Sequence, residues 1–116
     1  MKKYKVNVLG SIYVVEIAPY TKYPVLFGKA LGWCDFHAKK IVVLDMATVE
    51  LVDDELNTQS PDKATERIFR HELVHAFFYE SGLDTESDFA RDEILVDFLA
   101  MQIPKMAKMF EKLSLL

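Results

Sequence analysis

The hexapeptide Arg70-His71-Glu72-Leu73-Val74-His75 places two histidines four residues apart, with a glutamate directly after the first. On an α-helix this spacing puts both imidazoles on one face, close enough to bind one metal ion. Zinc in catalytic sites takes three protein ligands and leaves one position for water, whose pKa falls to about 7. Glu72 is placed to accept the proton of that water. The stretch therefore predicts a zinc site with His71 and His75 as ligands and Glu72 as general base.

A chance pair of core or surface histidines on an amphipathic helix would show the same spacing. The chain has only 3 histidines, however, and two of them fall here, with Glu72 between them. All three side chains interrupt a strongly apolar segment. Burying three titratable groups next to one another is costly unless something pairs them. The metal site is therefore the preferred interpretation.

The helix that this motif requires has clear start and stop signals. Ser60 is a good N-cap, Pro61 suits the first helical position, and Gly82 suits a left-handed C-cap. The helix is expected to run from about residue 61 to residue 81. Its apolar side chains occupy two sides, so we expect a sheet on one side and the last helix on the other.

The residues before this helix predict a small sheet. Period-two alternation or β-branched residues mark the expected strands, which cover residues 4–9, 12–18 and 40–45, and residues 32–35 can form a further short strand. A tight turn at Gly10-Ser11 joins the first two strands, and residues 36–39 form the turn before the last one. Residues 20–31 are compatible with a short helix or an irregular loop. Residues 46–60 are expected to form a loop that can hold a helical turn.

A second helix is expected from about Ser87 to residue 103, because Pro104 does not favour its continuation. The tail, residues 105–116, also carries apolar side chains at helical spacing. We interpret these side chains as core packing rather than as a cofactor site. They are Met106, Met109, Phe110 and Leu113.

Glu93, on the second helix, is the preferred third metal ligand. At about 100° per residue it lies roughly 40° from the centre of the apolar face of that helix. A carboxylate within an apolar face needs a partner, and a zinc ion supplies one. Asp97, one turn further on, is placed to accept the ring N–H of a ligand imidazole. We therefore assign Glu93 to the metal and Asp97 to the support of a histidine ligand.

Other residues remain alternatives at this position. The competing acidic ligands are Glu86, Asp88, Asp92 and Asp97. His37, in a predicted turn, is a further candidate as a ligand or as a hydrogen-bond donor to the transition state. The acids could instead pair in structural salt bridges with Arg67, Arg70 or Arg91.

The run from Arg70 to Phe77, followed by Glu93-Ile94-Leu95-Val96-Asp97 and by Ala100, resembles the gluzincin clan of zinc metallopeptidases. It is similar to the small ImmA/IrrE-like metallopeptidases of bacteria and phages, and the motif covers residues 68–100. Val74 departs from the small residue that is usual inside this helix. The chain also lacks the length for the DNA-binding or regulatory domain that some relatives carry.

The length of the chain fits one domain, residues 1–116. The resemblance implies an α+β, minimal zincin-like fold. A small, mostly antiparallel sheet would pack on the His-Glu-x-x-His helix, and a glutamate-bearing helix would follow. The resemblance also implies Zn²⁺ bound by His71, His75 and Glu93, with Glu72 as general base.

Composition limits the class of protein further. The 116-residue chain is 51% hydrophobic and has a formal net charge of -4 with both signs interleaved, which indicates neither a nucleic-acid nor a membrane partner. Its single cysteine, Cys34, excludes an internal disulfide. We recognise neither a signal peptide nor a segment of transmembrane length. We therefore expect a cytoplasmic protein.

Three functions are compatible with these residues. The first is a zinc endopeptidase whose protein or peptide substrate adds to an edge strand, for which Ile41–Asp45 is the candidate. The candidate hydrogen-bond donors to its oxyanion are Tyr20, Tyr23, His37 and Tyr79. The second is a non-catalytic, antirepressor-like interaction module with a structural zinc. The third is a hydrolase with a non-peptide substrate, which would use the same site residues.

Overall fold

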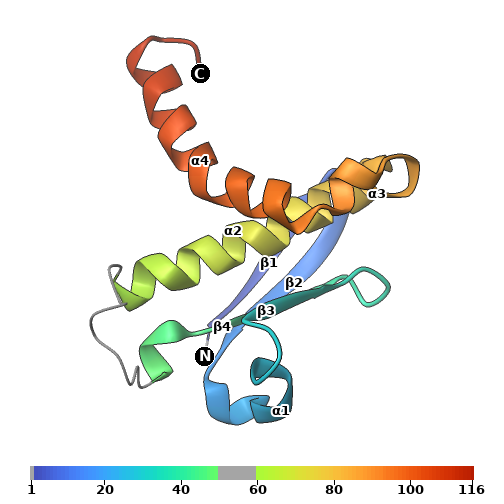
Figure 1. The fold of residues 1–116 in the computed structure, drawn as a ribbon, viewed down its shortest axis with the longest axis vertical. Helices are drawn as coiled ribbons and strands as arrows, with labels where there is room; N and C mark the ends of the chain where they lie inside the picture. The colour runs from blue at the N-terminus through green and yellow to red at the C-terminus, as the bar shows by residue number, and fades with distance from the viewer. Residues whose placement is uncertain (1, 50–59) are drawn as a thin grey trace.

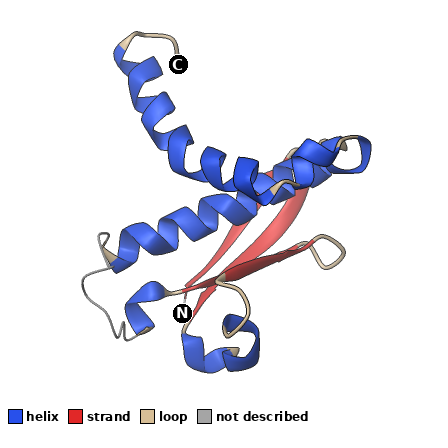
Figure 2. Ribbon diagram, viewed as in Figure 1, coloured by secondary structure: helices blue, strands red, loops and turns tan. Residues whose placement is uncertain are grey.

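The computed structural model describes residues 2–49 and 60–116, which form a four-stranded sheet and several helices (Figure 1). The strands are β1 (Lys2–Val8), β2 (Ser11–Ala18), β3 (Gly32–Asp35) and β4 (Lys40–Leu44). Two long helices, α2 (Pro61–Glu80) and α4 (Glu93–Lys112), follow the sheet in sequence and lie on one side of it (Figure 2). The predicted α+β class is confirmed.

The sheet is mixed, with the strand order β1-β2-β4-β3. β1 and β2 are antiparallel, β2 and β4 are parallel, and β3 and β4 are antiparallel. β4 therefore lies inside the sheet, and the prediction that Ile41–Asp45 forms the edge strand is wrong. Its continuous apolar run, Ile41 to Leu44, is buried on both faces of the sheet, which is typical of a central strand. The edge nearest to β4 is β3.

The first hairpin turns one residue earlier than the sequence suggested. Leu9 and Gly10 have φ angles of 50° and 97°, and Ser11 already belongs to β2. Two consecutive residues with positive φ are typical of the two-residue hairpin turns that match the twist of a sheet.

Local capping signals mark both ends of helix α2, which packs against the sheet and against helix α4. The Ser60 hydroxyl accepts a hydrogen bond from the Lys63 backbone N–H, and Gly82, with a φ of 82°, follows the helix end. Leu73 and Ala76 pack on the sheet core around Tyr13. Helix α4 covers another side of α2 (Figure 1), so the predicted two-sided packing is confirmed.

The chain between α2 and α4 contains more short elements than predicted. A short helix α3 (Leu83–Glu86) lies in the predicted connection, and a 3₁₀ turn η4 (Asp88–Arg91) replaces the first turn of the expected helix. Helix α4 begins only at Glu93, because the Asp92 carboxylate caps it by accepting from the N–H groups of Ile94 and Leu95. Asp92 is therefore occupied as a helix cap, which explains the later start.

Helix α4 also runs through Pro104, so the prediction that the helix ends before this residue is wrong. A proline inside a helix leaves the carbonyl four residues earlier without its backbone donor. Here that carbonyl belongs to Ala100, and it accepts a hydrogen bond from Arg70 Nε at 2.6 Å. The α2 side chain thus supplies the missing donor, and α4 bends and continues away from the sheet (Figure 1).

The interpretation of the tail as core packing is also wrong. Met106, Met109 and Leu113 are 42%, 51% and 59% exposed. The second half of α4 projects from the rest of the fold, so these side chains find no core to enter (Figure 1).

The opposite face of the sheet carries a smaller apolar cluster. Two short elements, η1 (Tyr20–Lys22) and α1 (Pro24–Phe27), bring aromatic rings onto Trp33 of β3. After β4, the 3₁₀ turn η2 (Met46–Thr48) supplies the helical turn allowed by the sequence. The rest of that predicted loop, residues 50–59, lies outside the described residues. No described helix combines the length and the apolar character needed to cross a bilayer.

Candidate metal centre

Two helices bring the predicted ligands together. His71 and His75 lie one turn apart on α2, on the side that faces the start of α4. Glu93 is the first residue of α4. The Asp92 cap sets where this helix starts and therefore also positions the Glu93 side chain. The site therefore depends on the α2–α4 contact rather than on either helix alone.

The donor atoms of these three residues converge. Glu93 Oε2 lies 2.9 Å from His71 Nε2, and Glu93 Oε1 lies 3.0 Å from His75 Nε2. One ligand atom from each residue lies within 4.8 Å of the others. Two imidazole nitrogens and one carboxylate oxygen are a donor set that zinc accepts. The chemistry and the spacing of the three side chains fit a zinc ion.

The two candidate ligands on α2 are more buried than the one on α4. The side chains of His71 and His75 are 20% and 17% exposed, whereas that of Glu93 is 68% exposed. The expectation that Glu93 sits within an apolar face is therefore wrong. The reason is its position at the first residue of α4, where the side chain reaches past the helix end towards the histidines.

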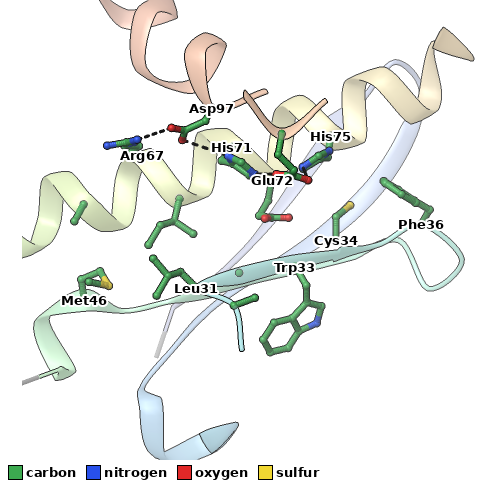
Figure 3. A pocket seen from close by; sticks show the side chains of 15 residues that line it. Leu31, Trp33, Cys34, Phe36, Met46, Arg67, His71, Glu72, His75 and Asp97 are labelled. Atoms are coloured by element: carbon green, nitrogen blue, oxygen red, sulfur yellow. Dashed lines mark hydrogen bonds and ion pairs between the residues drawn. The ribbon is translucent and has the colours of Figure 1, made fainter. Parts of the chain in front are cut away.

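Asp97 lies behind the first histidine. Its Oδ1 is 3.5 Å from His71 Nδ1, while its Oδ2 accepts a hydrogen bond from Arg67 Nη2 at 2.6 Å (Figure 3). The hydrogen bond from Arg67 holds the pKa of Asp97 below its usual value. His71 thus presents Nε2 to Glu93 and Nδ1 to a carboxylate that stays ionised. The Arg67 salt bridge anticipated as an alternative exists alongside this contact.

Glu72 is buried beside the histidines. It is 7% exposed, and burial raises its pKa to about 7, with the neighbouring His71 lowering it and Glu93 raising it. The edge strand β3 passes close underneath. A Cβ atom at Gly32 would lie 3.2 Å from Glu72 Cγ and 2.9 Å from Ile68 Cγ2, so only glycine lets the strand come this near. A carboxyl group with a pKa near neutrality is suited to proton transfer.

A cavity of about 740 Å³ opens next to these side chains. Its polar side is formed by the histidines, Glu72, Glu93 and Asp97, together with Arg67. Apolar groups line the remainder: Ala30, Leu31, Trp33, Cys34, Phe36, Met46, Ala64 and Ile68. Figure 3 shows Cys34 pointing from β3 towards α2, whereas the Trp33 ring points away from the helices. Residues of β3 therefore line one wall of the cavity.

The structure does not bring the predicted oxyanion donors to this site. Tyr79 stacks on Phe36 with ring centroids 4.3 Å apart, and Tyr23 makes an edge-to-face contact with Trp33 on the opposite face of the sheet. His37 is exposed in the turn before β4. The described residues that line the cavity include neither these three nor Tyr20.

The remaining acidic alternatives also lie elsewhere. Asp88 pairs with Arg91 at 2.6 Å, and Asp92 caps α4. Neither belongs to the group of donor atoms that converges on one point, and neither does Glu86. Arg70 bonds the Ala100 carbonyl rather than an acid.

Sequence reasoning missed Gly32 and the role of β3 in the site. A glycine inside a strand often marks a close approach of another group to the backbone, and Gly32 opens the short strand. That signal could have pointed to β3 as the strand beneath the motif.

Comparisons with protein families, with curated proteins and with solved structures found no match to this chain.

Proposed function

We propose that this chain is a cytoplasmic zinc-dependent metallopeptidase with a minimal zincin-like fold, akin to the gluzincins and the small ImmA/IrrE-like enzymes. One observation carries the proposal. His71, His75 and Glu93 converge within 4.8 Å, and the buried Glu72 lies beside them at an open cavity.

Each side chain has a distinct role in this proposal. Zinc held by the three ligands would supply Lewis-acid chemistry and make hydroxide available near neutral pH. Glu72 would take the proton of the attacking water and pass it to the leaving amine. Asp97 would accept the Nδ1–H of His71, which leaves Nε2 free to bind the metal.

A peptide substrate would pair with the free edge of β3. This strand pairs with β4 on one side only and borders the cavity next to Glu72. An extended peptide that adds to such an edge gains backbone hydrogen bonds, and its side chains can enter neighbouring pockets. The apolar part of the cavity, around Leu31, Met46 and Ile68, would receive one of them.

The donor set favours catalysis over the antirepressor-like alternative. Structural zinc sites are usually closed by four protein ligands. Cys34 lines the same cavity but does not join the converging donor atoms, so the described residues offer three ligands. An open position beside a buried glutamate is the arrangement that hydrolysis needs.

The test is peptide cleavage by zinc-loaded protein, read by mass spectrometry on a library of unstructured peptides. Wild type is expected to cleave, whereas Glu72→Gln should keep its zinc and lose cleavage, because glutamine cannot accept the proton. Glu66→Gln is the matched control, since Glu66 is exposed on the same helix and pairs with Lys63. Equal cleavage by Glu72→Gln, or no cleavage by zinc-loaded wild type, would overturn the proposal.

A further inference from the structure

Five polar side chains form a continuous ladder between α2 and α4. Arg67, His71 and His75 follow one another at intervals of four residues on α2, and Glu93 and Asp97 are four residues apart on α4. Contacts alternate between the two helices. Asp97 lies 2.6 Å from Arg67 and 3.5 Å from His71, and Glu93 lies 2.9 Å from His71 and 3.0 Å from His75. Arg67 therefore ends the ladder on the side away from His75.

The contact between Asp97 and His71 depends on something that holds the carboxylate in place. At 3.5 Å it is longer than an ordinary hydrogen bond of about 2.7–3.2 Å, so it does not fix the Asp97 side chain by itself. This side chain is also 40% exposed, so water competes for its oxygens. A carboxylate is planar, and a hydrogen bond to one of its oxygens therefore restrains the direction of the other.

Arg67 donates such a hydrogen bond. Its Nη2 reaches Asp97 Oδ2 at 2.6 Å, which is a short, charge-assisted contact. Asp97 is the only ionic partner of Arg67 among the described residues. The pair is partly exposed and adds little to folding by itself. Its structural consequence is that Asp97 Oδ1 stays directed at His71 Nδ1 (Figure 3).

We propose that Arg67 is a positioning residue of the candidate zinc site, which acts through Asp97 on His71 without touching the metal. The inference rests on the proposed function, because it needs zinc at His71. With Oδ1 held, Asp97 accepts the Nδ1–H of His71 and leaves Nε2 to the metal. Without Arg67, the Asp97 carboxylate turns towards water and the imidazole loses its orientation. The effect therefore falls on zinc affinity.

Zinc titration against a competing chelator tests the proposal. Arg67→Met should bind zinc about tenfold more weakly than wild type, at the lower end of the range for loss of such a partner. Arg70→Met is the matched control, because Arg70 also joins α2 to α4, through the Ala100 carbonyl, but has no described contact with Asp97. Its loss of affinity measures the contribution of helix packing and should be clearly smaller. Arg67→Lys should recover part of the affinity, since lysine keeps the charge but lacks the planar fork.

A double-mutant cycle separates action through Asp97 from a general effect on packing. In an Asp97→Ala background, Arg67→Met should lower zinc affinity no further, whereas Arg70→Met should act as it does in wild type. Circular dichroism should show equal helix content in all variants. Equal losses in Arg67→Met and Arg70→Met would overturn the inference, as would an undiminished effect of Arg67→Met in the Asp97→Ala background.

The orientation of His71 can also be observed directly. In zinc-loaded protein with ¹⁵N-labelled histidine, the Nδ1–H proton of His71 should give a signal in wild type and lose it to water exchange in Arg67→Met. The chain has only 3 histidines, which makes the signal simple to assign. An unchanged signal in Arg67→Met would contradict the positioning role.

Neither measurement reads peptide cleavage, so the two proposals fail separately. A wild type that binds zinc but cleaves no peptide would overturn the proposed function alone. Wild-type zinc affinity in Arg67→Met would overturn the role of Arg67 alone.

Discussion

Asp97 shows how one carboxylate can serve two partners. Its Oδ2 accepts from Arg67 at 2.6 Å, and its Oδ1 faces His71 Nδ1 at 3.5 Å. A half-exposed ion pair with Arg67 is by itself worth only about 0–1 kcal/mol. A carboxylate that orients a metal-binding imidazole has a larger effect, which falls on metal affinity rather than on folding.

We therefore expect Asp97→Asn to weaken zinc binding without abolishing it. Loss of such a partner typically lowers metal affinity by about 10- to 100-fold. Asparagine keeps an acceptor oxygen but loses the charge, so the loss should be partial. Zinc titration against a competing chelator measures it.

Asp88→Asn is the control for this substitution, because Asp88 is fully exposed and pairs with Arg91. Its zinc affinity should equal that of wild type. An unchanged affinity in Asp97→Asn would limit Asp97 to its ion pair with Arg67. A loss as complete as that in His71→Ala would make Asp97 a direct ligand.

Helix α4 continues through Pro104 because a side chain of α2 donates the hydrogen bond that the proline cannot donate. Arg70 Nε donates to the Ala100 carbonyl, the acceptor that a backbone N–H at position 104 would otherwise reach. The contact also ties the residue next to His71 to the helix that carries Glu93. It thus supports the packing on which the proposed metal centre depends.

A double-mutant cycle tests this repair. Arg70→Met should lower the free energy of unfolding by about 1.5–3 kcal/mol, the range for a hydrogen bond from a charged donor. In a Pro104→Ala background the backbone N–H is restored, so the same change should have a clearly smaller effect. Urea unfolding of the four proteins measures the coupling, and an equal effect of Arg70→Met in both backgrounds would contradict it.

Local signals predicted most of the elements and the two-sided packing of α2, but they did not predict the place of β4 in the sheet or the course of α4. Ser60 and Gly82 mark the ends of α2 as expected, and the period of the helix places His71 and His75 together. The central place of β4 was missed because the apolar run of that strand was not read as burial on both faces. The passage of α4 through Pro104 depends on Arg70, a residue 34 positions away, which no local pattern reveals.

In the candidate site, too, local spacing could be predicted, whereas some contacts between distant elements could not. Helical spacing fixes the relative places of His71, Glu72 and His75 on α2 and of Glu93 and Asp97 on α4, and the packing of α2 against α4 brings the two sets together. Gly32 was missed because its importance arises only when β3 passes beneath Glu72. The oxyanion candidates were proposed by residue type alone, and none of them is among the described residues that line the cavity.

Across the layers of the fold, Glu80 joins the end of α2 to the sheet. Its carboxylate accepts hydrogen bonds from Ser11 at 2.5 Å, Tyr13 at 2.7 Å and Lys39 at 2.6 Å. The Lys39 hydrogen bond is the main reason that the pKa of Glu80 falls to about 2 from an ordinary value of 4.5. The folded state therefore favours the ionised carboxylate, and this contribution to stability is present above pH 4.5 and lost as the pH falls towards 2.

We expect Glu80→Gln to melt at a lower temperature than wild type at pH 7, because the amide offers these donors one neutral oxygen. The difference should shrink between about pH 4.5 and pH 2, where wild-type Glu80 becomes protonated. Thermal melts followed by circular dichroism measure it, with Glu66→Gln as an exposed control on the same helix. A difference that is constant from pH 7 to pH 2 would show that the charge of Glu80 is not the cause.

The account rests on the proposed metal centre between α2 and α4, and the zinc content of purified protein tests it. After zinc loading and dialysis, mass spectrometry should find one zinc per chain in wild type. The variants His71→Ala, His75→Ala and Glu93→Ala should lose most of it, because each removes a ligand, whereas Glu86→Ala should keep it. Wild type without bound zinc, or Glu93→Ala with wild-type zinc content, would contradict the centre described here.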